Sequence, residues 1–348
     1  MVSAVLFITF FVLLVLNVPI SVCLGLSSAA AILYSGTSLT IVATNIYSGI
    51  SKFLLLAIPF FVLSGNIMAK AGISTRLIRF VDTCVGHRKG GIANVCIIVA
   101  CFFGAISGSG PATVAALGAV LIPAMVERGG FSAAFSTALM ATSSSIAIVI
   151  PPSIAFVVYA SITGVSIGDM FMAGIIPGIL MGLALVVVVM LEVRRNHVVP
   201  SNVEKASAKE RWNAFKDAFW GFLMPVIILG GIYGGIFTPT EAAAVSVVYG
   251  LFVGMIIYKE VKFKDLWEIL IDSAKTTGGI MLIVACASLF SFVCTRFGIS
   301  TAASELLARV AGNQFTFLLI CNIIFLIAGC FIDANSAMYI FIPIMLPV

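Results

Sequence analysis

Long apolar stretches, divided by short polar breaks, run along most of this chain and predict a bundle of membrane helices. Residues 2–16 and 20–34 are two such stretches, and residues 54–71 form a third. Asn17-Val18-Pro19 separates the first two, because proline lacks a backbone donor and clashes with the preceding turn. Further spans are predicted at residues 169–191, 219–237, 242–258 and 277–295.

One apolar stretch, residues 92–126, is interrupted near its middle. The arm before the interruption has 15 residues, about 22 Å of helix, and the arm after it is similar. Because a hydrocarbon core of about 30 Å needs about 20 residues, neither arm crosses it and the chain turns back inside the membrane. Backbone at that depth persists only inside protein or along a cavity, so the break is a candidate site. The interruption consists of Ser107, Gly108, Ser109, Gly110 and Pro111.

Two other apolar segments carry polar breaks. Residues 131–160 hold four hydroxyl side chains at positions 142–145 and are interrupted by Pro151-Pro152-Ser153. Residues 315–348 contain Asp333-Ala334-Asn335-Ser336. Burying a carboxylate in the membrane costs free energy, and such a group is usually paired or functional. Asp333 is therefore a candidate cation ligand.

An internal repeat relates the first and last of these breaks. Gly72-Ile73-Ser74-Thr75 recurs as Gly298-Ile299-Ser300-Thr301, an offset of 226 residues, and each copy opens an amphipathic segment. The same offset carries Ser107 onto Asp333. Agreement in order, offset and character predicts two structural repeats.

Composition and charge define the class and the orientation. With 61% hydrophobic residues, 9% charged residues and a mean hydropathy of +1.20, the chain is predicted to be a polytopic membrane protein. The net charge of +5 reports topology and not nucleic-acid binding. If the first amphipathic segment is cytoplasmic, only Lys52, Arg296 and Arg309 of the 19 Lys and Arg lie outside. The amino terminus is then periplasmic, and the two hairpins enter from opposite faces.

The predicted fold is an all-α polytopic membrane protein with inverted-topology repeats, two re-entrant helical hairpins and a broken helix. Because the first repeat continues well beyond its hairpin, the second lacks about 70 residues by symmetry, and we expect a longer parent protein. The first repeat, 1–192, comprises scaffold helices 1–72, an amphipathic arm 73–91, the hairpin 92–127, the broken helix 131–163 and a span 169–192. A cytoplasmic connector, 193–218, follows it. The second repeat, 219–348, comprises scaffold helices 219–296, an arm 297–312 and a hairpin 315–348.

A hairpin tip joins the carbonyl end of one half-helix to the N–H end of the next. Carbonyls coordinate cations and N–H groups hold anions. The hydroxyls of Ser107, Ser109 and Thr113 add oxygen ligands suited to sodium. The alternative is a purely structural role, in which Ser109 and Asp333 cap helices and the hydroxyls at 142–145 hydrogen-bond to their own helix. Glu241, in Thr238-Pro239-Thr240-Glu241, is interpreted mainly as part of a capped helix start.

Catalytic and metal clusters are not predicted. The eight cysteines show neither paired nor metal-ligand spacing and are interpreted as small apolar side chains. His87 lies on the amphipathic arm and His197 in the connector. An intramembrane hydrolase using Ser107 or Ser109 would need a His or Lys base within reach, and the interiors of the predicted spans hold none. We therefore do not expect an enzyme; a purely structural membrane scaffold is the remaining alternative outside transport.

Residues 104–118 resemble the signature of the large membrane subunit of tripartite ATP-independent periplasmic (TRAP) transporters, the DctM or SiaM type. The resemblance implies an elevator-type sodium symporter of the bacterial inner membrane, similar to the ion transporter superfamily. It also implies a small membrane subunit of the DctQ or SiaQ type, and a periplasmic binding protein of the DctP or SiaP type that delivers an organic acid, such as a dicarboxylate or sialic acid. Matching positions follow in order at Pro19-Ile20, Ala57-Ile58-Pro59, residues 86–91, Ile150-Pro151-Pro152-Ser153, residues 171–177 and residues 238–244.

The candidate site follows from the residues at the breaks together with this resemblance. Na⁺ is the expected coupling ion, and a stand-alone sodium-coupled di- or tricarboxylate symporter of the divalent-anion type is the alternative. The predicted sodium ligands are Ser107, Gly108, Ser109, Gly110, Thr142, Ser143, Asp333, Asn335 and Ser336. The predicted substrate-binding residues are Thr113, Ser144, Ser145, Pro151, Pro152 and Ser153.

Overall fold

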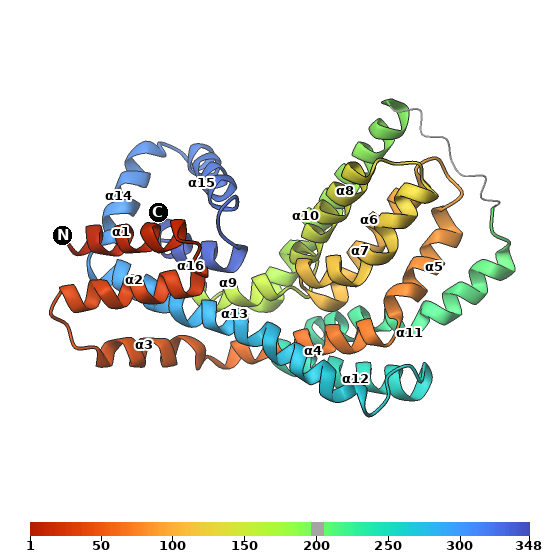
Figure 1. Ribbon diagram of the computed structural model, residues 1–348, viewed down its shortest axis with the longest axis horizontal. Helices are drawn as coiled ribbons and strands as arrows, with labels where there is room; N and C mark the ends of the chain where they lie inside the picture. Colours follow the sequence, from red (N-terminus) through yellow and green to blue (C-terminus); the bar gives the residue numbers. More distant parts are fainter. Residues whose placement is uncertain (196–204) are drawn as a thin grey trace. The chain divides into compact units, whose positions relative to one another are not determined.

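The computed structural model describes residues 1–195 and 205–348, and the described residues form helices and connecting turns without strands (Figure 1). Within the described residues, six helices are long and apolar enough to cross a membrane, or seven when a bent pair counts as one span. The prediction of an all-helical polytopic protein is therefore confirmed. The helices are α1 (Val2–Val15), α2 (Ile20–Tyr34), α3 (Thr40–Ile50), η1 (Phe53–Leu56), α4 (Ala57–Lys70), α5 (Ile73–Val85), α6 (Gly91–Ser107), α7 (Gly110–Glu127), α8 (Ala133–Val149), α9 (Ile154–Thr163), α10 (Ile167–Arg195), α11 (Ala208–Tyr233), α12 (Pro239–Leu251), the π-helical turn η2 (Phe252–Ile257), α13 (Asp265–Arg296), α14 (Ile299–Val310), α15 (Gln314–Ala328) and α16 (Ala334–Met345).

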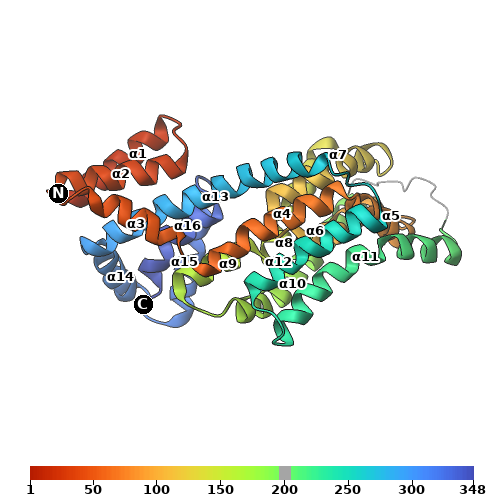
Figure 2. The ribbon, with the colours of Figure 1, turned by 90° about the horizontal axis from the view of Figure 1, so that it is seen from below.

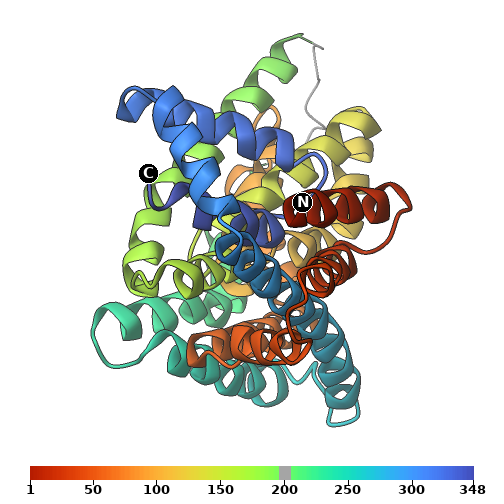
Figure 3. The ribbon, with the colours of Figure 1, turned by 90° about the vertical axis from the view of Figure 1, so that its left-hand side faces the viewer.

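The chain divides into two compact units, each with its own packing. The first unit consists of Met1–Leu55, Val158–Val165 and Lys275–Val348, and the second of Leu56–Val157 and Ser166–Ala274. In the first unit α1 packs on α2, and α14 contacts both α15 and α16 (Figure 3). In the second unit α4 packs on α12, which also contacts α11 (Figure 2).

Several boundaries differ from the sequence prediction. Helix α3 was not predicted, because its polar residues at 40, 44, 45 and 48 obscure the apolar pattern and only Gly49 is buried. Helix α13 begins 12 residues before the predicted span at 277, and α11 begins inside the predicted connector, 193–218. The middle of that connector, with His197, lies outside the described residues.

The amphipathic arm α5 is confirmed as a helix with one apolar face. Gly72 precedes it with a left-handed φ of 69°, and Gly298 precedes α14 with the same value. Ile73, Leu77 and Val81 follow at intervals of four and are buried. Because residues four apart share a helix face, burial of these three leaves the basic side chains of α5 directed elsewhere. The inverted orientation of the two repeats stays a prediction.

Candidate functional site

Helices α6 and α7 form a hairpin in the second unit. A Cβ added to Gly129, just after α7, would lie 2.5 Å from Cγ2 of Ile92 at the start of α6. The chain therefore returns to the level from which it started. Their 17 and 18 residues correspond to about 26 Å each. By length and composition alone α7 qualifies as a span, but its return beside α6 makes it the second arm of the hairpin (Figure 1).

The turn at the tip takes only two residues, Gly108 and Ser109. Gly108 has a left-handed φ of 60°, a backbone conformation that costs free energy for residues other than glycine. The side chain of Ser109 caps α7 by accepting from the N–H of Ala112 at 3.5 Å. Pro111 occupies the first turn, where its missing donor does no harm. The predicted break is confirmed, and it is narrower than the sequence suggested.

Oxygen atoms converge inside the tip. The Thr113 hydroxyl donates to the main-chain oxygen of Ser109 at 2.8 Å and lies 3.3 Å from the Ser107 hydroxyl. The Ser107 hydroxyl also lies 3.4 Å from the Ser109 carbonyl oxygen. Ser107 and Thr113 are buried. This cluster offers two hydroxyls and a carbonyl without any charged side chain.

The tip packs against the break between α8 and α9. These two helices are bent by 44° relative to each other, which confirms the predicted broken helix. The N–H of Ile154, the first residue of α9, donates to the carbonyl oxygen of Gly108 at 3.4 Å. A Cβ on Gly108 would lie 2.7 Å from the Pro152 carbonyl oxygen, and one on Gly110 would lie 3.2 Å from that of Ser144. Two broken segments, far apart in sequence, thus meet through their backbones.

The hydroxyl residues of α8 divide into two groups. Ser143 and Ser144 are buried, whereas Thr142 and Ser145 are exposed. The Thr142 hydroxyl donates to the Ala138 carbonyl at 2.8 Å, and that of Ser144 to the Ala141 carbonyl at 2.6 Å. Both side chains therefore bond their own helix. What Ser144 presents toward the tip is its main-chain oxygen.

At the α8–α9 break, the prolines and the serine are all buried. Ser153 donates its hydroxyl proton to the carbonyl of Ile148 and accepts from the N–H of Phe156 at 3.4 Å. It therefore joins the end of α8 to the start of α9. Pro151 and Pro152 supply carbonyls and no donors, which leaves the oxygen of Pro152 directed at Gly108.

The second break lies in the first unit, between α15 and α16. The rings of Phe325 and Phe341, eight residues before and after Asp333, have centroids 5.8 Å apart, as expected for a hairpin. One Asp333 oxygen accepts from the N–H groups of Asn335 and Ser336 at 2.9 and 3.3 Å, and the other accepts from the Ser336 hydroxyl. Asp333 is exposed and caps α16, so the capping interpretation describes its present contacts. Asp333 and Ser109 each cap the second helix of a hairpin. The structural counterpart of Asp333 is therefore Ser109, whereas the offset of 226 residues had indicated Ser107.

Sequence reasoning missed one contributor to the first tip. A Cβ on Gly65 of α4 would lie 3.2 Å from Cα of Ser107, so α4 contacts the tip through a glycine. The neighbouring Ser64 is fully buried, and its hydroxyl has no hydrogen-bond partner among the described residues. The signal was present as a Ser-Gly pair in an apolar helix, since small residues mark close helix contacts in membranes.

The sequence also singled out a helix start at residues 238–241, outside the tips. Glu241 and Thr238 form a reciprocal capping box: the Thr238 side chain accepts from the N–H of Glu241 at 3.3 Å, and the Glu241 carboxylate accepts from the N–H of Thr238 at 2.8 Å. The predicted capped helix start is confirmed. All eight cysteines are free thiols. Across residues 1–195 and 205–348, the His, Cys, Asp and Glu side chains form no group that could hold a metal ion.

Comparison with known proteins identifies the family. Residues 7–348 match the model of the tripartite ATP-independent periplasmic transporter, DctM component. The chain is 38% identical to the C4-dicarboxylate TRAP transporter large permease protein DctM of Rhodobacter capsulatus, over 97% of this chain and 79% of that protein. It is 41% identical to the protein of the same name from Pseudomonas aeruginosa, over 93% and 76%.

A third relative combines two components in its name. The isethionate TRAP transporter permease protein DctMQ of Oleidesulfovibrio alaskensis is 39% identical, over 99% of this chain and 54% of that protein. All three relatives are named as permease proteins, in agreement with the expectation that the chain is not an enzyme. The chain therefore belongs to the DctM family of tripartite ATP-independent periplasmic transporters, as a large permease subunit that crosses the membrane several times.

Proposed function

We propose that this subunit carries out sodium-coupled uptake of an organic acid across the bacterial inner membrane. The observation that carries the proposal is the packing of the first hairpin tip against the α8–α9 break. Gly108 accepts a hydrogen bond from Ile154 across this contact. The carbonyls of Ser109, Ser144 and Pro152 lie in or beside it.

Oxygen is the ligand type that hard cations prefer, and these oxygens come from carbonyls and hydroxyls. The carboxyl end of α6 and the amino end of α7 meet at Gly108 and Ser109. Half-helix ends of this kind coordinate sodium and anionic groups in secondary transporters. The buried hydroxyls of Ser107 and Thr113 complete a candidate sodium site with no charge of its own. Asp333 in the second hairpin supplies the carboxylate that a second sodium would neutralise.

The substrate class and partners follow from the relatives. Two are named for C4-dicarboxylates and one for isethionate, all small organic anions. We infer that a periplasmic binding protein delivers the acid and that a small membrane subunit of the DctQ type supports the scaffold. The amino terminus lies in the periplasm. The loaded hairpins then move together across the membrane, as in an elevator.

Uptake in proteoliposomes tests the proposal. The transporter, reconstituted with its small subunit and supplied with binding protein and radiolabelled C4-dicarboxylate, should accumulate label only along an inward sodium gradient. Undiminished uptake after replacement of sodium by potassium would contradict sodium coupling. Uptake that needs no binding protein would instead support the stand-alone symporter of the divalent-anion type.

A further inference from the structure

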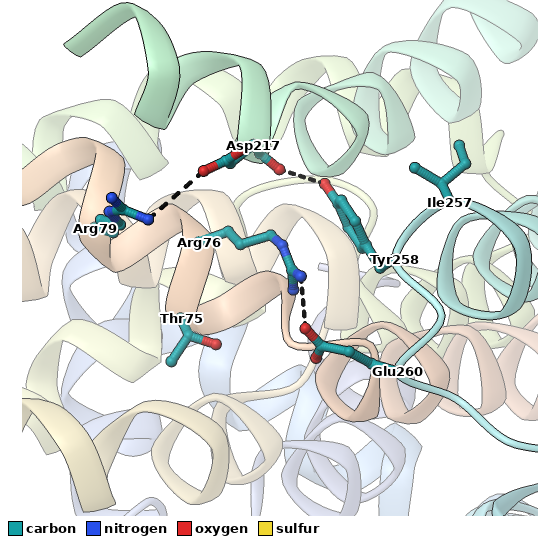
Figure 4. A pocket seen from close by; sticks show the side chains of 7 residues that line it. All are labelled: Thr75, Arg76, Arg79, Asp217, Ile257, Tyr258 and Glu260. Carbon is teal, nitrogen blue, oxygen red and sulfur yellow. Dashed lines mark hydrogen bonds and ion pairs between the residues drawn. The ribbon is translucent and has the colours of Figure 1, made fainter. Parts of the chain in front are cut away.

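A polar cavity lies in the second unit, where the start of α5 meets α11 and the end of η2 (Figure 4). Its volume is about 430 Å³, within the range of about 300–1,000 Å³ that is usual for small-ligand sites. Equal numbers of cationic and anionic side chains line it, together with a tyrosine. They are Arg76, Arg79, Asp217, Tyr258 and Glu260.

The ion pair between Arg76 and Glu260 lines one side of this cavity and is held by several contacts. Arg76 donates to Glu260 at 2.5 Å and to the carbonyls of Ala71 and Gly72 at 3.1 and 3.0 Å. Its guanidinium carbon lies 3.9 Å from the centre of the Tyr258 ring, close enough for a cation–π contact. With these contacts, Arg76 is held in place before any ligand arrives.

The other ion pair, between Arg79 and Asp217, is exposed to solvent. Arg79 and Asp217 approach only to 3.6 Å, and their side chains are 71% and 52% exposed. An exposed pair of this kind contributes about 0–1 kcal/mol, so a ligand can displace it at little cost. The Tyr258 hydroxyl donates to the main-chain oxygen of Asp217 at 2.6 Å.

The cavity lies at the level where the membrane surface is expected. The candidate span Pro239–Ile257 ends at its lining residue Ile257. Trp212 and Trp220 flank Asp217 on α11, and tryptophan is enriched at membrane interfaces. From the cavity back along α12 and η2, an exposed apolar stripe with a spacing of four consists of Ile256, Phe252 and Val248. A ligand with a polar head and an apolar tail would fit this arrangement.

We propose that this cavity binds the zwitterionic phosphoethanolamine headgroup of a membrane phospholipid. The phosphate binds Arg79, the ammonium group lies between Asp217 and Glu260, and the acyl chains follow the stripe. A headgroup without an ammonium group would leave Asp217 without a cationic partner once the phosphate had displaced it from Arg79. A choline headgroup has no N–H to donate to Asp217 or Glu260. Charge complementarity therefore selects phosphatidylethanolamine over phosphatidylglycerol and phosphatidylcholine.

Native mass spectrometry of the full chain in detergent, with dioctanoyl forms of the three lipids, tests this selection. Phosphatidylethanolamine should bind about tenfold more tightly than either of the others, the change expected from one lost charge-assisted hydrogen bond. Asp217→Asn should remove that preference, whereas Arg79→Ala should weaken the binding of all three lipids, because they share the phosphate. Both side chains are largely exposed, so the variants should fold. Arg88, an exposed arginine beyond the end of α5, provides the matched control: Arg88→Ala should bind as the parent does.

Three outcomes would overturn the proposal. Equal binding of phosphatidylethanolamine and phosphatidylglycerol would show that the cavity recognises only the phosphate that the two lipids share, and not the ammonium group. An unchanged preference in Asp217→Asn, or an unchanged affinity for all three lipids in Arg79→Ala, would place the headgroup elsewhere. Soluble phosphoethanolamine that binds as tightly as the lipid would exclude a contribution from the apolar stripe. None of these results depends on sodium or on uptake.

Discussion

The two hairpin tips use the same backbone device with different electrostatics. In each, an oxygen-bearing side chain caps the second helix: Ser109 caps α7 and Asp333 caps α16. The first tip is neutral and is enclosed by α4 and the α8–α9 break. The second tip carries a carboxylate that is exposed within its own unit.

This difference indicates how each tip would bind a cation. A neutral cluster relies on carbonyl and hydroxyl dipoles, so its geometry must already be correct before the ion arrives. A carboxylate attracts the ion by charge and tolerates looser geometry. We therefore expect the first tip to be sensitive to changes in shape, and the second to changes in charge.

The largest expected effect comes from Gly108→Ala. The new Cβ would lie 2.7 Å from the Pro152 oxygen, and φ is 60°. The conformational cost of about 1 kcal/mol and an overpacking cost of about 1–3 kcal/mol add together. Thermal unfolding in detergent should show a clear loss of stability, and sodium-driven uptake should fall more than tenfold.

Gly164→Ala is the control for that change. Gly164 has a φ of +77° with nothing within 4 Å of an added Cβ, so this variant incurs the conformational cost alone. Equal losses of stability in the two variants would show that the contact with Pro152 does not constrain the tip.

The next effect separates charge from capping in the second tip. Asp333→Asn removes the charge but keeps a good capping residue, whereas Asp333→Ala removes both. Sodium-driven uptake should fall more than tenfold in both variants. Only Asp333→Ala should lose stability, by about 1 kcal/mol. Full uptake by Asp333→Asn, measured alongside normal membrane insertion, would remove the carboxylate from the transport site.

A smaller effect is expected for Ser109→Ala. The cap contact is long, 3.5 Å, so the loss of stability should be about 0.5 kcal/mol. If the tip binds sodium, the half-saturating sodium concentration should also rise a few-fold, because the local geometry loosens. Ser132 caps α8, and its side chain accepts from the N–H of Phe135 at 3.2 Å. Ser132→Ala removes this cap. That control should lose stability without any change in the sodium dependence of uptake.

The helices with strong local signals were predictable from sequence. Pro19 separates α1 from α2, and Gly72 and Gly298 begin the two arms, because proline and glycine act through their own backbone geometry. Helix α3 was missed because polar residues at 40, 44, 45 and 48 interrupt its apolar stretch. The long α13 was only half predicted, since Glu268 and Asp272 mask its apolar pattern.

The site was predictable as a set of segments and not as a set of contacts. Sequence reasoning located the Ser107–Gly110 turn and the Pro151–Ser153 break, and the structure brings them together. The orientations of the hydroxyls depend on helix phase, which places Thr142 outward and Ser143 inward. The contact of Gly65 with Ser107 depends on packing between helices, which no local pattern reveals.

The smallest effect is expected for Glu241→Gln, which tests whether an acidic residue at a helix start differs from one at a hairpin tip. Glutamine preserves the reciprocal capping box with Thr238, so stability should hardly change. Uptake should stay within about twofold, because the capping role places Glu241 outside the transport site. Glu241→Ala, as the paired variant, should lose about 1 kcal/mol of stability and little uptake. A fall in uptake for Glu241→Gln as deep as for Asp333→Asn would contradict the capping role and add Glu241 to the transport machinery.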